Sequence, residues 1–286
     1  MTALRLMLVA IWVMVSGFTT GSSDNSDPVG DFFSMLRPPK IQLPDLGIVP
    51  FWSNDFKRAR GAYLDGDYTQ AVKYFRRASY DGNMVADWYL GNMYRLGQGV
   101  SLDRATAYSY YVRVAENYDP EEPDPTRLRV AVDAQLRVAD YLRTGIRSAK
   151  LVANPQTAAR TYLRIATSYG HPRALYCLGT MSIEGEGMAK NPSQGLKWLN
   201  AAVRKHSPDA AAYLAELYAT GTLVKQDDTR ALMWYIVAAK SATKTENPIV
   251  FSRLNELRLA ANEETRIEAE ARARVWIEQN PIRPGE

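Results

Sequence analysis

Apolar positions recur with a helical period from about residue 56 to residue 242, and the whole pattern repeats about every 36 residues. In each unit an Asp or Asn is followed four residues later by a small residue, and seven and eight residues later by a bulky pair that contains an aromatic ring. This spacing predicts one helical face, opened by a side chain that caps the first N–H groups. The five capping positions are Asp67, Asp103, Asn154, Asn191 and Asp227.

A second pattern precedes four of these capping positions and predicts a first helix in each of those units. An alanine leads, a pair such as Leu-Gly or Leu-Ala follows four and five residues later, and a glycine stands eleven residues after the lead. Glycine ends helices because it adopts positive φ without steric cost. Gly97 and Gly99 are therefore interpreted as a helix-ending turn, since a phosphate-binding loop would need a strand before it. The leading residues are Ala86, Ala134, Ala174 and Ala210, and the closing glycines are Gly97, Gly145, Gly185 and Gly221.

Together the two patterns form the motif A-x3-LG-x2-Y-x2-GxGV-x2-D-x3-A-x2-WY-x2-A, which resembles the Sel1-like repeat, a relative of the tetratricopeptide repeat. GQGVSLDRATAYSYYVRVA and TLVKQDDTRALMWYIVAA match it best, and the first unit is closer to the tetratricopeptide pattern. The resemblance implies an all-α fold, a right-handed α-solenoid of about five helical hairpins over residues 55–245. Residues 246–286 predict capping helices and a tail, because the last repeat of such an array needs a polar outer layer.

The N-terminus predicts export. Residues 6–18 form an apolar run of 13 residues after one basic residue, which is short for a membrane span of about 20 residues and suits a signal peptide over residues 1–21. An uncleaved anchor is the alternative. No cysteine directly follows this run, so we expect no lipid anchor and a periplasmic location. Residues 22–54 are proline-rich and predict an extended leader, whose apolar spots pack on its own fold or on a partner.

Composition and candidate chemistry point away from catalysis. The formal charge of +4 with 46% hydrophobic residues supports a sizeable core and does not require nucleic acid. Cys177 is the single cysteine and has apolar neighbours, so we interpret it as a core residue rather than a reactive thiol. His171 and His206 stand in different units without metal-ligand spacing. We therefore expect no catalytic residue, no cofactor and no metal.

Protein binding is the function that a helical-repeat array favours. Such arrays bind on a concave face lined mainly by the first helix of each unit, and aromatic and Arg side chains are common interface anchors. For Trp88 and Tyr176 the alternative is packing between neighbouring units. The candidate partner-binding residues are Arg60, Tyr63, Trp88, Asn92, Arg95, Asp140, Arg143 and Tyr176.

The order of segments resembles periplasmic Sel1-repeat regulators of the ExoR type, with a signal peptide, a tetratricopeptide-like first unit, the insert NYDPEEPDPTRLR and the lengthened turn GIRSAKLVANP. That resemblance implies a negative regulator that binds the periplasmic domain of a membrane sensor histidine kinase, holds it off, and so controls exopolysaccharide and envelope genes. One alternative is a non-catalytic scaffold of a cell-envelope or polysaccharide-export assembly. Another is a hydrolase on a repeat scaffold, although those Sel1 proteins carry paired cysteines that this chain lacks.

Overall fold

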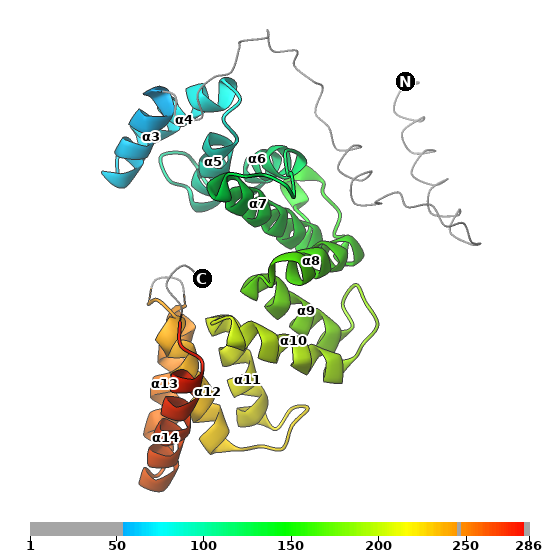
Figure 1. The fold of residues 1–286 in the computed structure, drawn as a ribbon, viewed down its shortest axis with the longest axis vertical. Coiled ribbons are helices and arrows are strands. Elements are labelled where there is room, and N and C mark those ends of the chain that lie inside the picture. The colour runs from blue at the N-terminus through cyan, green and yellow to red at the C-terminus, as the bar shows by residue number, and fades with distance from the viewer. Residues whose placement is uncertain (1–53, 245–246, 283–286) are drawn as a thin grey trace, which may run out of the picture. The chain divides into compact units, whose positions relative to one another are not determined.

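The computed structural model describes residues 54–244 and 247–282, which form α-helices joined by turns, with one short 3₁₀ helix. The predicted signal peptide and almost all of the leader lie outside the described residues. Consecutive helices pack against each other in pairs, as Figure 1 shows along the colour gradient from α3 to α14. The predicted all-α architecture of repeated helical hairpins is confirmed.

Five helix pairs make up the array, and each has a first and a second helix. The pairs are α3 (Asn54–Leu64) with α4 (Tyr68–Tyr80), α5 (Met84–Leu96) with α6 (Arg104–Glu116), α7 (Pro125–Thr144) with α8 (Pro155–Tyr169), α9 (Pro172–Glu184) with α10 (Pro192–Arg204), and α11 (Pro208–Thr220) with α12 (Asp228–Ser241). The 3₁₀ helix η1 (Arg147–Ala149) lies between α7 and α8. The last two helices, α13 (Pro248–Ala260) and α14 (Glu263–Gln279), both pack on α12.

Side chains at the predicted capping positions begin the second helix of every pair. Asp103, for example, accepts hydrogen bonds from the backbone N–H groups of Ala105 and Thr106. These bonds satisfy donors that have no partner within the helix. All five predicted capping residues accept such a bond, namely Asp67, Asp103, Asn154, Asn191 and Asp227.

Glycine allows the helices of a pair to approach closely. A Cβ atom on Gly195 would lie 2.7 Å from the carbonyl oxygen of Gly179 and 2.6 Å from Cγ1 of Ile183. A Cβ on Gly91 would lie 3.0 Å from the ring of Tyr111, which is fully buried. The small residues of the repeat motif therefore set the spacing inside a pair, and the aromatic residues fill the space that remains.

The two glycines of the GxG motif have different structural roles. Gly97 ends α5 in the left-handed conformation with φ 71°, as the sequence predicts. Gly99 also has positive φ, and a Cβ there would lie 2.4 Å from the backbone carbonyl of Tyr68. Gly187 stands in the same way against Pro155. The second glycine therefore lets the turn of one pair rest on the start of the preceding pair's second helix.

In the part of the chain that the structure describes, no helix combines the length and the apolar character that a membrane crossing requires.

We expect opposite effects on stability when alanine replaces a glycine in a tight helix contact and when it replaces a glycine with no neighbouring atoms. Gly195→Ala forces two backbones apart and is expected to lower the free energy of unfolding by about 1–3 kcal/mol. Gly61→Ala, inside α3 with nothing within 4 Å of the new Cβ, is expected to raise it by about 0.5–1 kcal/mol. Denaturant unfolding of both variants checks this. Equal effects at the two positions would contradict the close packing of α9 on α10.

Candidate functional site

In the four first helices α5, α7, α9 and α11, a polar residue directly follows the pair that consists of Leu or Val and then Gly or Ala, which we call the small pair. We call the place of this polar residue the acceptor position. In three pairs a buried tyrosine of the second helix donates its hydroxyl to that residue. Tyr111 donates to Asn92 Oδ1 at 2.9 Å, and Tyr162 donates to Asp140 Oδ1 at 2.7 Å. The Tyr235 hydroxyl contacts Glu216 in the same way.

The pair α9 and α10 lacks both members of this bond. Its second helix carries Leu199 where the other pairs have tyrosine, and its acceptor position is Thr180. The Thr180 hydroxyl donates to the backbone carbonyl of Cys177 in its own helix at 3.0 Å. Because the tyrosine and its acceptor are both replaced in this pair, the exchange leaves neither a hydroxyl donor nor a side-chain acceptor without a hydrogen bond at this place.

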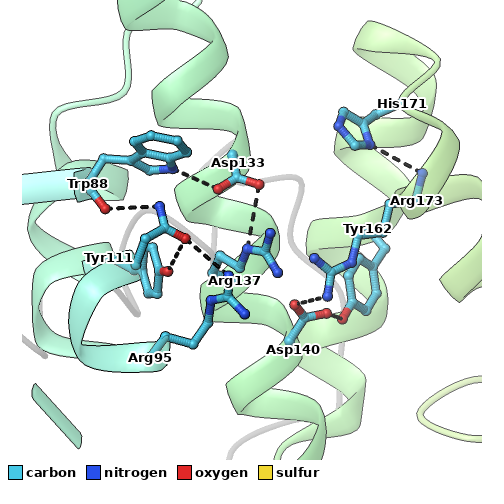
Figure 2. A network of polar contacts seen from close by, with 10 residues as sticks. Trp88, Arg95, Tyr111, Asp133, Arg137, Asp140, Tyr162, His171 and Arg173 are labelled. Carbon is cyan, nitrogen blue, oxygen red and sulfur yellow. Dashed lines mark hydrogen bonds and ion pairs between the residues drawn. The ribbon is translucent and has the colours of Figure 1, made fainter. Parts of the chain in front are cut away.

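Where the residue at the acceptor position is charged, the helix that follows the pair supplies a cation. Arg173 of α9 forms an ion pair with Asp140 of α7. Arg253 of α13 donates to both carboxylate oxygens of Glu216, at 2.9 and 3.3 Å. The neutral Asn92 receives a 3.3 Å hydrogen bond from Arg95 of its own helix instead. Figure 2 shows Asp140 between Tyr162 and Arg173.

Burial and pairing compete in setting the pKa values of these acids. Burial raises the pKa of Asp140 and outweighs the favourable charge of Arg173 and the hydrogen bond from Tyr162. Burial also opposes ionisation of Glu216, but the bonds from Arg253 and Tyr235 prevail and hold its pKa below the ordinary value. The Glu216 site is therefore the better compensated of the two.

A cleft of about 550 Å³ opens between α5, α7 and the start of α9. Its walls are mainly apolar and aromatic, and Trp88 on α5 and Asp133 on α7 meet there through a 2.7 Å bond from the indole N–H. His171 lies on the third side, where its Nδ1 accepts the backbone N–H of Arg173 and caps α9. Burial lowers the pKa of His171, which favours the neutral form that this bond requires. Figure 2 shows these groups from three successive helix pairs.

Most of the predicted partner-binding residues also make contacts within the fold. Asn92 is buried, whereas Arg60 is exposed on α3. Tyr63 is half-buried and donates to Gln98 Oε1 at 3.3 Å. Arg143 donates to Glu186 Oε2 from two nitrogens, at 2.8 and 2.5 Å.

Trp88 and Tyr176 satisfy both interpretations of their role. Each packs between neighbouring pairs, since Trp88 bonds to Asp133 and the Tyr176 ring lies edge-on to Tyr213 at 6.3 Å. Each also lines a cleft, and the cleft at Tyr176 has a volume of about 360 Å³. The predicted partner-binding residues therefore lie along the first helices. That they bind a partner stays a prediction.

Several polar residues beside the clefts and the acceptor positions were not predicted as site residues from the sequence: Asp133, Arg137, Arg173, Glu216 and Arg253. For Glu216 a signal exists, because it directly follows a small pair just as Asn92 and Asp140 do. Arg173 and Arg253 carry no such signal, since their partners Asp140 and Glu216 lie 33 and 37 residues away. Arg137 instead pairs with Asp133, four residues earlier in its own helix. Within residues 54–244 and 247–282, no group of three or more His, Cys, Asp or Glu side chains has a geometry that could hold a metal ion.

Comparison with known proteins places the array in a family. The Sel1 repeat pattern matches residues 59–83, 85–119, 172–207 and 208–242. The chain is therefore a Sel1-repeat protein. The unmatched stretch holds the pair α7 and α8, which carries the same bond between tyrosine and acceptor through Tyr162 and Asp140.

Two curated relatives bear the same name, exopolysaccharide production negative regulator. The protein of Rhizobium leguminosarum bv. viciae is 32% identical over 162 residues, which are 57% of this chain and 60% of that protein. The protein of Rhizobium meliloti (strain 1021) is 32% identical over 147 residues, which are 51% of this chain and 54% of that one. The chain is homologous to these regulators, and the similarity spans only about half to three fifths of their length.

A solved structure supports the fold alone. The crystal structure of a Sel1 repeat protein from Oxalobacter formigenes is 23% identical and has a TM-score of 0.54, covering 78% of this chain and 88% of that one.

Removing the cation beside Asp140 is expected to destabilise the fold in a pH-dependent way. Arg173→Met leaves a poorly solvated carboxylate and should lower the free energy of unfolding near neutral pH by about 1–2 kcal/mol, less than for a fully buried pair because 35% of the Arg173 side chain is exposed. The pKa of Asp140 then rises further above its unfolded value. The native state therefore gains protons first, and the loss shrinks as pH falls through that raised pKa.

Urea unfolding from about pH 7 to about pH 4 measures this effect. Asp140→Asn combined with Arg173→Met should recover part of the loss at neutral pH. Arg104→Met, which removes an exposed arginine, is the control and is expected to change little. A loss that does not depend on pH would contradict a charged Asp140 as its cause.

The Cys177 thiol is predicted to be inert in the native protein. It is buried, and burial raises its pKa to about 11, so almost no thiolate forms near neutral pH. We expect Ellman's reagent to react with it only after unfolding. A native reaction rate close to that of the unfolded chain would show an open, activated thiol instead.

Proposed function

We propose that this chain is a periplasmic negative regulator of exopolysaccharide production that acts by binding another protein. The proposal is carried by its homology to two proteins named as such regulators, at 32% identity over half or more of the chain. The repeat family supports protein binding, since helical-repeat arrays present extended surfaces to partners. The apolar run near the N-terminus supports export to the periplasm.

The partner that we propose is the periplasmic domain of a membrane sensor histidine kinase. Binding would hold the kinase off if this chain has higher affinity for the inactive than for the active conformation. No bond is made or broken in such a mechanism. Release of the partner, for example by removal of the regulator, would then permit kinase activity and change exopolysaccharide output.

The first helices offer the chemistry that such contact needs. Arg95 and Arg137 stand on successive first helices. The Nε atom of Arg95 is buried without a hydrogen-bond partner in the described part of the chain, whereas the Nε atom of Arg137 lies 3.5 Å from Asp133 Oδ1 in an ion pair. Leaving a buried donor without an acceptor is unfavourable. Carboxylate or carbonyl oxygens of a partner would bond to the outer nitrogens of these guanidinium groups, while apolar partner side chains would suit the cleft beside Trp88.

Arg95→Met provides the sharpest test of this surface. The variant removes a guanidinium whose hydrogen bond to Asn92 is long, and Tyr111 still bonds to Asn92 at 2.9 Å. Thermal stability should therefore change little, whereas affinity for the partner should fall about tenfold, as for an arginine anchor. Lys73→Met on α4 removes an exposed cation from a second helix and serves as the matched control.

The partner is identified by crosslinking the tagged mature chain in living cells, followed by capture and mass spectrometry. We expect one inner-membrane histidine kinase, whose recovery falls in Arg95→Met and not in Lys73→Met. Loss of that kinase gene should also suppress the exopolysaccharide phenotype of a deletion of this gene. Recovery of polysaccharide-export proteins without a kinase would refute the proposed mechanism and favour the scaffold function.

A further inference from the structure

The solvent side of α14 is apolar along its centre. Ile267 and Val275 lie four residues before and after Ala271, so the three side chains fall within about 80° around the helix axis. Ile267 is 63% exposed and Val275 is 52% exposed, and Ala271 is exposed as well. Ala269 and Ala273, on the opposite side of the helix, are completely buried. We call Ile267, Ala271 and Val275 the α14 stripe.

This stripe does not fit a helix that only caps the array. The last helix of a repeat array needs a polar outer face to remain soluble, and that was the expectation from the sequence. The structure instead shows a stripe beside a shallow groove of about 420 Å³, where Met233 of α12 also contributes. The outer side of α14 is therefore apolar at its centre and charged along its flanks.

The charged residues that flank the α14 stripe form a pattern that is complementary to the same pattern on a second, antiparallel copy of α14. On one flank stand Glu268 and Arg272, which form an ion pair at 2.6 Å within the helix. On the other flank stand Glu270 and Arg274. If a second α14 crosses in the opposite direction at Ala271, a twofold axis brings Glu268 of each copy near Arg272 of the other. The same axis brings Glu270 near Arg274.

We propose that the α14 stripe is an interface between two copies of this chain, with the two α14 helices antiparallel and crossing at Ala271. The small side chain at the crossing point permits close approach of the helices. Spacing of four residues along the stripe matches the packing class in which helices cross at about 50°. Glu264 and Glu278, which would otherwise face each other at the two ends, then diverge into solvent.

The occupant is a second copy because both the apolar and the charged positions match under one twofold axis. A different protein would need its own complementary pattern, whereas this helix already carries one. The contact is one helix per copy, below the roughly 800 Å² per partner of standard interfaces, so we expect a weak dimer with a Kd on the order of 10–100 µM. This inference rests on α14 and is independent of the kinase proposal.

A charge-reversal mixture tests the interface directly. Glu268→Arg puts arginine against arginine across the twofold axis, and Arg272→Glu puts glutamate against glutamate. Each mature variant alone should dimerise at least tenfold more weakly than the wild-type chain in sedimentation equilibrium. An equimolar mixture of the two should recover association, because each arginine then meets a glutamate of the other chain.

The mixture also separates loss of the interface from loss of the fold. Circular dichroism melting should show both variants folded, and Ile267→Glu should abolish dimerisation alone and in every mixture. A wild-type chain that stays monomeric well above about 100 µM overturns the proposal. So does a dimer that persists in Ile267→Glu, or a mixture that associates no better than either variant alone.

Discussion

The helices of a pair are held at their centre by a buried bulky side chain of the second helix that packs on a glycine of the first, as Tyr111 does at Gly91 and Leu199 does at Gly179. Three of the five pairs add a hydrogen bond from a tyrosine hydroxyl to the acceptor position, as Tyr162 does to Asp140. A buried hydroxyl without a partner costs free energy, so this bond links the choice of residue on one helix to that on the other. The pair with Leu199 obeys the same constraint, because its acceptor position is a threonine that bonds within its own helix.

The charged acceptors extend this constraint from one repeat to the next. A carboxylate placed in a partly buried position needs a cation, and in both cases the cation belongs to the helix that follows the pair, Arg173 of α9 for Asp140 and Arg253 of α13 for Glu216. Neighbouring repeats are thereby joined by ion pairs as well as by apolar packing. Glu216 and Arg253 also line the cleft beside Tyr176, so groups that join neighbouring elements of the array form part of a concave surface.

Much of the fold could be predicted from the sequence because its determinants are local. Asp103 caps a helix through N–H groups two and three residues away, and Gly97 ends one through its own φ. The candidate site was predicted less fully. Trp88 and Tyr176 stand out as aromatic residues on a first helix, but Arg173 gives no hint of its role, since its partner Asp140 lies 33 residues away in another repeat.

The sequence by itself determined the repeat, its period, the caps and the all-α class, since each follows from interactions within about one helical turn or one hairpin. The tertiary structure decided which polar residues are paired and which donors stay unsatisfied, because those depend on how one repeat rests on the next. It also decided the character of the terminal helix. Only packing on α12 shows that Ala269 and Ala273 are the buried side, which leaves Ile267 and Val275 facing solvent.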